Sequence, residues 1–224
     1  MERKRELSLL YDQTSSLYDR RYSLLQERKY RRIFPHLPRR GRILDVGCGT
    51  GLLLGKLKGF EVVGLDLSLG MLKRARRRNP GVPLILADAE HLPFKGGAFR
   101  MVLSITVLQN LPHPALALRE MARVLRKGGK VVVSTLRYKY GRKVREWMED
   151  AGFEVVEEGE EGEDLYFVGV KVRGSGGLYP SGPPAPPSSG FPPPVSCCDR
   201  PSPPPPPLPS PPRSRKASSS HTSP

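Results

Sequence analysis

The sequence predicts an α/β domain built on a doubly wound, mostly parallel seven-stranded sheet. An apolar run at 43–46 is followed by three glycines in five residues and then by a helical pattern of leucines. Four further strand-like runs alternate with helical patterns, and two strand-like runs joined by an acidic turn end the pattern. Such alternation predicts a parallel sheet covered on both faces, and the last two runs predict a hairpin.

The strands are expected, in chain order, at residues 43–46, 61–65, 83–87, 99–105 and 130–135, with the final pair at 153–157 and 165–172. One helix is expected directly after Gly51, and a second from Ser68, as its N-cap, to residue 78. A third is expected over 114–125 with Gly128-Gly129 as its end, and a fourth over 141–151.

Composition divides the chain into three parts. Residues 1–39 carry aromatic and aliphatic side chains at the spacing of one or two amphipathic helices, with a break near 14–16 and an end at Pro35. We expect these helices to form a lid, because little chain elsewhere is free to cover a site. Residues 40–173 form the sheet domain. Residues 174–224 hold most of the 25 prolines and few branched apolar residues, so this tail is predicted to be disordered.

The glycine-rich turn is the main candidate site. Residues 47–51 read G-x-G-x-G, which differs from the G-x-G-x-x-G of dinucleotide-binding enzymes. A strand, a tight turn and a helix start bring backbone N–H groups to a ligand. Asp45 ends the first strand and Asp66 ends the second, where a carboxylate can bind ribose hydroxyls in doubly wound folds. The alternative for Asp66 is that it only caps the next helix.

At Leu44 to Gly51 the sequence, LDVGCGTG, resembles the first motif of the class I S-adenosylmethionine-dependent methyltransferases. The resemblance covers about residues 40–172 and implies a Rossmann-like sheet with an antiparallel last strand, and S-adenosylmethionine as cofactor. Residues 87–94, ADAEHLPF, are similar to the third motif of the quinone-biosynthesis branch within the type 11 methyltransferases.

The resemblance also implies cofactor-binding roles. Asp45, Gly47 and Gly49 would hold the methionine end, Asp66 the ribose, and Leu67 and Met71 the faces of the adenine. Asp88 would meet the adenine amino group, and Ala89 would offer its backbone N–H. The expected set is completed by Cys48 and Gly51 in the glycine turn and by Ser104, which opens the fourth motif.

No catalytic residue follows directly from the fourth motif, residues 104–114. Methyltransferases that act on exocyclic amines of bases carry N/D-P-P-Y/F there, and this chain does not. Three candidates stay open: His113, Asn110 and Tyr18. His113 lies between two prolines and has a solvated loop residue as its alternative, while Tyr18 has a core position as its alternative. The pairs Tyr11-Asp12 and Tyr18-Asp19 resemble N-terminal Tyr-Asp pairs of small-molecule methyltransferases.

The net charge of +15 favours anionic partners, nucleic acid first. Three functions therefore stay open. The first, slightly favoured, is direct in-line methyl transfer to RNA, with transfer RNA as the simplest candidate. The second is methyl transfer to a small molecule such as a quinone precursor, and the third is a non-catalytic cofactor-binding module. RNA would bind a basic rim on the N-terminal helices, formed by Arg20, Arg21, Arg28, Lys29, Arg31 and Arg32.

Other features of the sequence point to few further partners. Cysteine spacing predicts no metal site, and no apolar run is long enough for a membrane span, so we expect a cytoplasmic protein. The prolines at 203–207 are a candidate ligand for a polyproline-binding partner domain, with a passive extension as the alternative.

Overall fold

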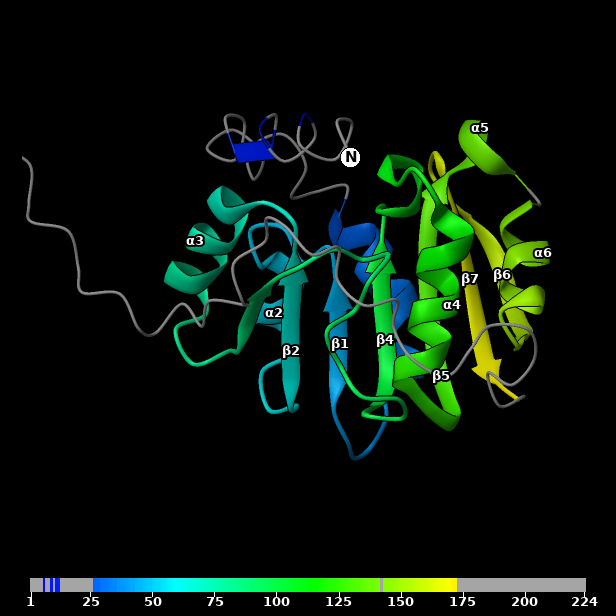
Figure 1. Ribbon diagram of the computed structural model, residues 1–224, viewed down its shortest axis with the longest axis horizontal. Helices are drawn as coiled ribbons and strands as arrows, with labels where there is room; N and C mark the ends of the chain where they lie inside the picture. Colours follow the sequence, from blue (N-terminus) through cyan, green and yellow to red (C-terminus); the bar gives the residue numbers. More distant parts are fainter. Residues whose placement is uncertain (1–5, 7–8, 10, 13–25, 142, 173–224) are drawn as a thin grey trace, which may run out of the picture.

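The computed structural model describes residues 6, 9, 11, 12, 26–141 and 143–172. Its core is a seven-stranded sheet with the strand order β3-β2-β1-β4-β5-β7-β6 (Figure 1). The expected α/β fold with a mostly parallel sheet is confirmed. The proline-rich tail and Tyr18 lie outside the described residues.

Five strands form the parallel part of the sheet: β1 (Ile43–Val46), β2 (Val62–Asp66), β3 (Leu84–Leu86), β4 (Phe99–Ile105) and β5 (Leu125–Leu136). All four residues of β1, the middle one of these five parallel strands, are buried, as expected for a strand covered on both faces. The carboxyl ends of these strands therefore meet at one edge of the sheet and their amino ends at the other.

Helices cover both faces of the sheet. One buried cluster joins the sheet to α4 (Pro114–Val124) and α6 (Lys143–Asp150). The other joins it to α2 (Leu52–Lys56), to α3 (Leu69–Arg78) and to the helical residues 26–33. Residues 26–172 also contain three short helices: η1 (Phe34–His36), η2 (Leu108–Asn110) and α5 (Arg137–Tyr140). The arrangement is doubly wound, as predicted.

The hairpin at the end of the domain is formed by β6 (Phe153–Glu161) and β7 (Asp164–Lys171). β7 runs antiparallel to both of its neighbours, β5 and β6, so the expectation of an antiparallel last strand is confirmed. β6 is longer than predicted, because the acidic residues assigned to a turn continue it, whereas β7 keeps its predicted length and begins one residue earlier.

Two predicted boundaries were wrong. α4 ends at Val124, and β5 begins at once with Leu125 rather than at residue 130. The pairing of β4 with β5 jumps from Phe99–Leu125 to Met101–Lys130, and the intervening residues loop out at Gly128, which has a φ of +69°. The two glycines therefore interrupt a strand instead of ending a helix. The helix predicted over 141–151 is α6, which begins at residue 143.

Basic residues of helix 26–33 and η1 pack against the acidic hairpin. The contacts are Lys29 with Asp164 at 2.8 Å, Arg32 with Glu161 at 3.0 Å, and His36 with Glu157 at 3.3 Å. Arg28 and Arg31 are exposed, whereas Arg20 and Arg21 lie outside the described residues. Two of the six residues expected to form an RNA-binding rim therefore serve to hold the N-terminal helix on the domain.

Two negative findings concern the described residues alone. No helix among them is long and apolar enough to cross a membrane. Their histidine, cysteine and carboxylate side chains form no group that could hold a metal ion.

Lys29 and Asp164 are expected to dominate the docking of the N-terminal helix, since their side chains are 13% and 3% exposed. Lys29→Met leaves the Asp164 carboxylate buried without its cation, which should lower the free energy of unfolding by about 3–5 kcal/mol. Lys56→Met is the matched control, because the Lys56–Glu27 pair joins the same helix to the domain through half-exposed groups. Chemical denaturation should show a much smaller effect for the control. Equal effects would contradict the assignment.

Candidate functional site

A pocket opens at the carboxyl ends of β1, β2 and β4, the edge at which open α/β sheets bind ligands. It holds about 780 Å³ of empty space, part of which is continuous with solvent. Its lining comes from the glycine turn, the ends of β2 and β4, the loop after β3 and the N-terminal segment. The lining residues are Tyr11, Gly47, Gly49, Leu65, Asp66, Leu67, Ser68, Met71, Ala87, Asp88, Ala89, Ile105, Thr106, Val107, Asn110, Leu111 and Pro112.

The glycine turn needs its glycines for two different reasons. Gly47 has a φ of +74°, and a Cβ atom there would lie 2.4 Å from a methyl carbon of Val107, which leaves no room for a side chain. Gly49 has a φ of +53°, and a Cβ there would meet nothing within 4 Å. The backbone at Gly49 therefore faces open space at the pocket, so a ligand can approach it closely.

Asp66 ties the two sides of the pocket together. One of its carboxylate oxygens accepts a hydrogen bond from the N–H of Gly49 at 2.8 Å, and the other accepts one from the N–H of Ser68 at 2.9 Å. Burial raises the pKa of Asp66, and these N–H groups oppose the shift. Each oxygen keeps acceptor capacity toward the pocket. Asp66 does not cap α3 itself, because Ser68 is the N-cap residue of that helix, so the capping alternative for Asp66 is replaced by an indirect role in holding Ser68.

Asp45 lies beneath the turn and is 3% exposed. Its Oδ2 atom has no hydrogen-bond partner, which is costly for a buried carboxylate. Burial, and secondarily the charge of Asp66, raise the pKa of Asp45 to about 7. A cationic group brought close to Asp45 would satisfy this oxygen and favour its charged form. The ammonium group of S-adenosylmethionine is such a cation, so the residues present fit the expected cofactor.

The predicted cofactor residues divide into two groups. Those that line the pocket are Gly47, Gly49, Asp66, Leu67, Met71, Asp88 and Ala89. Those that lie outside its lining are Asp45, Cys48, Gly51 and Ser104. Cys48 packs into the core against α2 and β2, Gly51 fits closely against Asn79, and Ser104 is fully buried in β4. The side chains of Cys48 and Ser104 therefore face the protein interior, and so would any side chain placed at position 51.

Two described residues of the N-terminal segment, Tyr11 and Asp12, make contacts at the pocket and beside it. Asn110 Nδ2 donates a hydrogen bond to the hydroxyl of Tyr11 at 2.9 Å. Asp12 accepts hydrogen bonds from the hydroxyl of Ser68 and, at 2.8 Å, from the N–H of Gly70 at the start of α3. A Cβ at Gly70 would lie 2.9 Å from Asp12 Cα, so this glycine permits the close approach. These contacts hold Tyr11 and Asp12 against the loop after β4 and the start of α3, and the lid role expected for residues 1–39 stays a prediction.

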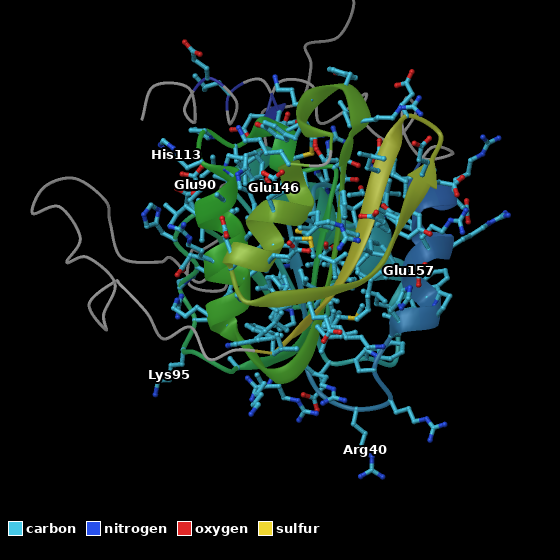
Figure 2. All side chains as sticks on the ribbon, turned by 90° about the vertical axis from the view of Figure 1, so that its right-hand side faces the viewer. Arg40, Glu90, Lys95, His113, Glu146 and Glu157 are labelled. Atoms are coloured by element: carbon cyan, nitrogen blue, oxygen red, sulfur yellow. The ribbon has the colours of Figure 1, made fainter. Side chains whose placement is uncertain are left out.

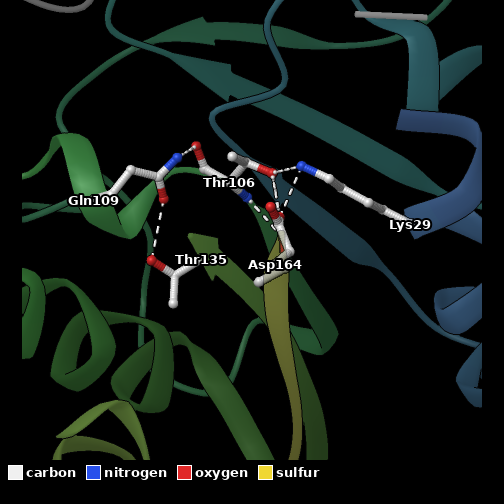
Figure 3. A network of polar contacts seen from close by, with 6 residues as sticks. Lys29, Thr106, Gln109, Thr135 and Asp164 are labelled. Carbon is white, nitrogen blue, oxygen red and sulfur yellow. Dashed lines mark hydrogen bonds and ion pairs between the residues drawn. The ribbon is translucent and has the colours of Figure 1, made fainter. Parts of the chain in front are cut away.

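A polar network fixes the loop after β4 (Figure 3). Thr106 has a φ of +61° and is the one non-glycine with a positive φ among the described residues. Its hydroxyl contacts both Lys29, at 2.7 Å, and Asp164, at 3.0 Å. Its carbonyl accepts a hydrogen bond from Gln109, whose side-chain oxygen accepts another from Thr135. These bonds hold a conformation that a β-branched residue rarely adopts.

The sequence missed this network because its members lie far apart in the chain. Thr106 could have been found from its place directly after a predicted strand, at the edge where ligands bind. Lys29 and Asp164 looked like parts of a basic run and an acidic run. Only the docking of the N-terminal helix on the hairpin brings them together.

The three catalytic candidates have different positions. Asn110 lines the pocket and binds Tyr11. His113 is exposed outside the pocket lining, and its backbone N–H donates to Glu90 at 2.7 Å. Tyr18 lies outside the described residues. Of the two candidates that the structure describes, Asn110 is the one that lines the pocket.

Comparison with known proteins agrees with the fold and the pocket. Residues 44–133 match the model of a methyltransferase domain, and this match includes the glycine turn, Asp66 and Asp88. Residues 44–133 thus carry a methyltransferase domain of the class I, S-adenosylmethionine-dependent type.

Methyltransferases are among the curated proteins to which the chain is similar. A demethylmenaquinone methyltransferase of Renibacterium salmoninarum is 38% identical over 142 residues, which are 59% of this chain and 60% of the relative. A phosphatidylethanolamine N-methyltransferase of Cereibacter sphaeroides is 37% identical over 126 residues, which are 53% of this chain and 62% of the relative. The chain thus spans less than two thirds of the length of either methyltransferase.

Solved structures of methyltransferases share the fold. A S-adenosylmethionine-dependent methyltransferase of Thermotoga maritima superposes with a TM-score of 0.61 and 25% identity, over 72% of this chain and 98% of that chain. A Haloferax volcanii methyltransferase complex with the activator Trm112 gives a TM-score of 0.64 at 19% identity, over 73% and 98% of the two chains, and shows the likeness of fold alone.

The raised pKa of Asp45 predicts pH-dependent binding of S-adenosylmethionine. Below pH 7 the buried carboxyl is largely protonated, so a cationic ligand must displace its proton. Affinity should rise as the pH rises from 5.5 to 7.5, with proton release on binding at pH 6. Calorimetry in buffers of different ionisation enthalpy measures this release. Asp45→Asn should weaken binding and abolish the release, and proton release that survives in this variant would exclude Asp45 as its source.

Proposed function

We propose that the protein transfers the methyl group of S-adenosylmethionine to a small, partly apolar acceptor bound in the same pocket. The observation that carries this proposal is the pocket itself. It combines a ligand-accessible glycine turn with Asp66 and Asp88 along one side and a largely apolar wall at the other. S-adenosylmethionine, when bound, supplies a methyl group on a positively charged sulfur that needs no further activation.

The residues of the chain are then needed for binding and alignment. Asp66 would bind the ribose hydroxyls, Asp88 and Ala89 the adenine edge, and Asp45 the ammonium group. During transfer, the acceptor's nucleophilic atom forms a bond to the methyl carbon, and the carbon–sulfur electron pair stays on sulfur. Holding the three atoms in line supplies most of the rate enhancement in such a reaction. A fixed loop after β4, held by the Thr106 network, suits this task.

The wall opposite the carboxylates supports a small-molecule acceptor. It is formed by residues with no expected role toward the cofactor: Tyr11, Ile105, Thr106, Val107, Asn110, Leu111 and Pro112. The polar groups among these side chains are the Tyr11 hydroxyl, the Asn110 amide and the Thr106 hydroxyl, and the last of these already contacts Lys29 and Asp164. Such a surface binds a compact molecule with an apolar body and few polar atoms. The names of the two curated relatives, demethylmenaquinone methyltransferase and phosphatidylethanolamine N-methyltransferase, agree with an acceptor that has an apolar body.

RNA as the methyl acceptor is the second candidate. Arg28 and Arg31 are exposed on the N-terminal helix and could contact a phosphate backbone. Lys29 and Arg32, however, already pair with carboxylates of the hairpin. This pairing removes half of the rim cations that the structure describes, and it is the reason that we place the small molecule first.

Labelled methyl transfer into a cell extract tests the acceptor class. With methyl-labelled S-adenosylmethionine, the label should enter the organic-soluble small-molecule fraction, and RNase treatment should not release it. Label recovered in RNA would instead establish the second candidate. Binding of the cofactor without any labelled fraction would indicate a non-catalytic module. Asp66→Ala should reduce labelling through weaker cofactor binding, by about 1–3 kcal/mol for the lost hydrogen bonds.

A further inference from the structure

The loops at the amino ends of the parallel strands form a strongly basic face, which we call the basal face. It consists of residues 37–42 before β1, 57–61 before β2, 94–100 at the start of β4 and 125–130 at the start of β5. These ranges contain one acidic residue, Glu61, and nine cations: Arg39, Arg40, Arg42, Lys58, Lys95, Arg100, Arg126, Lys127 and Lys130. Figure 2 shows Arg40 and Lys95 at the end of the molecule opposite to His113 and Glu90.

Direct contacts bring these loops together. A Cβ at Gly41 would lie 2.9 Å from Arg100 Cβ, and the strand pairing sets Lys130 opposite Met101. Four cationic or titratable side chains line one recess at this face: His36, Arg39, Arg100 and Lys130. The loops before β1, β4 and β5 therefore share one continuous basic surface.

Little on the chain neutralises this surface. Arg42 lies 3.8 Å from Glu61, and both side chains are largely exposed. Among the described residues, no carboxylate lies within 4.0 Å of the charged groups of Arg39, Arg100 or Lys130. On the N-terminal helix, by contrast, the charges of Lys29 and Arg32 are neutralised by carboxylates of the hairpin. The basal face thus carries much of the protein's uncompensated positive charge.

We propose that the basal face binds the phosphodiester backbone of a single-stranded nucleic acid. The four loops precede β2, β1, β4 and β5, which are consecutive in the sheet. Because neighbouring strands lie about 4.8 Å apart, the loops form a row roughly 15 Å long. A row of cations suits a linear chain of phosphates, and arginine, which predominates here, binds phosphate with two parallel hydrogen bonds. This inference is independent of the acceptor proposed above, since the pocket opens at the opposite edge of the sheet.

A nucleic acid fits the basal face better than an anionic membrane does. None of the exposed large apolar side chains of the described residues belongs to these four loops, so the face offers a bilayer no apolar anchor. Docking on a flat membrane would also turn the pocket away from the lipid. A phosphodiester chain needs neither an apolar anchor nor an alignment with the pocket.

Fluorescence anisotropy with a labelled twelve-nucleotide single-stranded RNA tests the proposal on the full chain. Affinity should fall steeply as the salt concentration rises, because bound cations release counterions from the phosphates. The variant Arg40→Gln, Arg126→Gln, Lys127→Gln changes only exposed side chains. It should weaken binding by more than about tenfold at low salt and reduce the salt dependence. A second variant, Arg39→Gln, Arg100→Gln, Lys130→Gln, should have the same effect through the recess.

The matched control removes the same charge elsewhere, with Arg28→Gln, Arg31→Gln and Arg119→Gln, all of them exposed residues. It should retain at least half of the affinity for the RNA, and all three variants should keep the parent melting temperature and cofactor affinity. Equal losses in the control and the basal variants would overturn the proposal. So would tighter binding to phosphatidylserine vesicles than to the RNA, or no salt-dependent RNA binding at all.

Discussion

The carboxylate of Asp66 is the interaction on which the site depends. It accepts hydrogen bonds from Gly49 in the turn after β1 and from Ser68 at the start of α3, so one side chain sets the distance between two walls of the pocket. Ser68 then caps α3 through the N–H of Met71 and donates to Asp12 of the N-terminal segment. The glycine turn, α3 and Asp12 of the N-terminal segment are therefore linked in one chain of hydrogen bonds.

The opposite charges of helix 26–33 and of the hairpin β6–β7 have a structural role. Basic residues of helix 26–33 pair with the acidic hairpin β6–β7, which places the helix over one face of the sheet. The buried member of this set, Asp164, also reaches Thr106 beside the pocket. The charge pattern that suggested an RNA surface at this helix is thus partly an internal contact, whereas the basal face remains uncompensated.

Much of the fold could be predicted from the sequence, because alternating strands and helices with glycine stops determine a parallel sheet locally. Gly47, Asp66 and Asp88 were found because they follow predicted strands at one edge. The boundary between α4 and β5 was predicted wrongly, since Gly128-Gly129 are equally suited to end a helix and to loop out of a strand. Tyr11, Thr106 and Lys29 acquire their positions from contacts between distant segments, which no local pattern contains.

The most direct test of the account is amide hydrogen exchange with and without S-adenosylhomocysteine, the demethylated form of the cofactor. A ligand held by the glycine turn and Asp66 should slow exchange at residues 46–51, 66–71 and 88–90, with little change in the loops of the basal face. Protection that is absent from the glycine turn, or that is centred on the basal face, would contradict the assignment of the pocket.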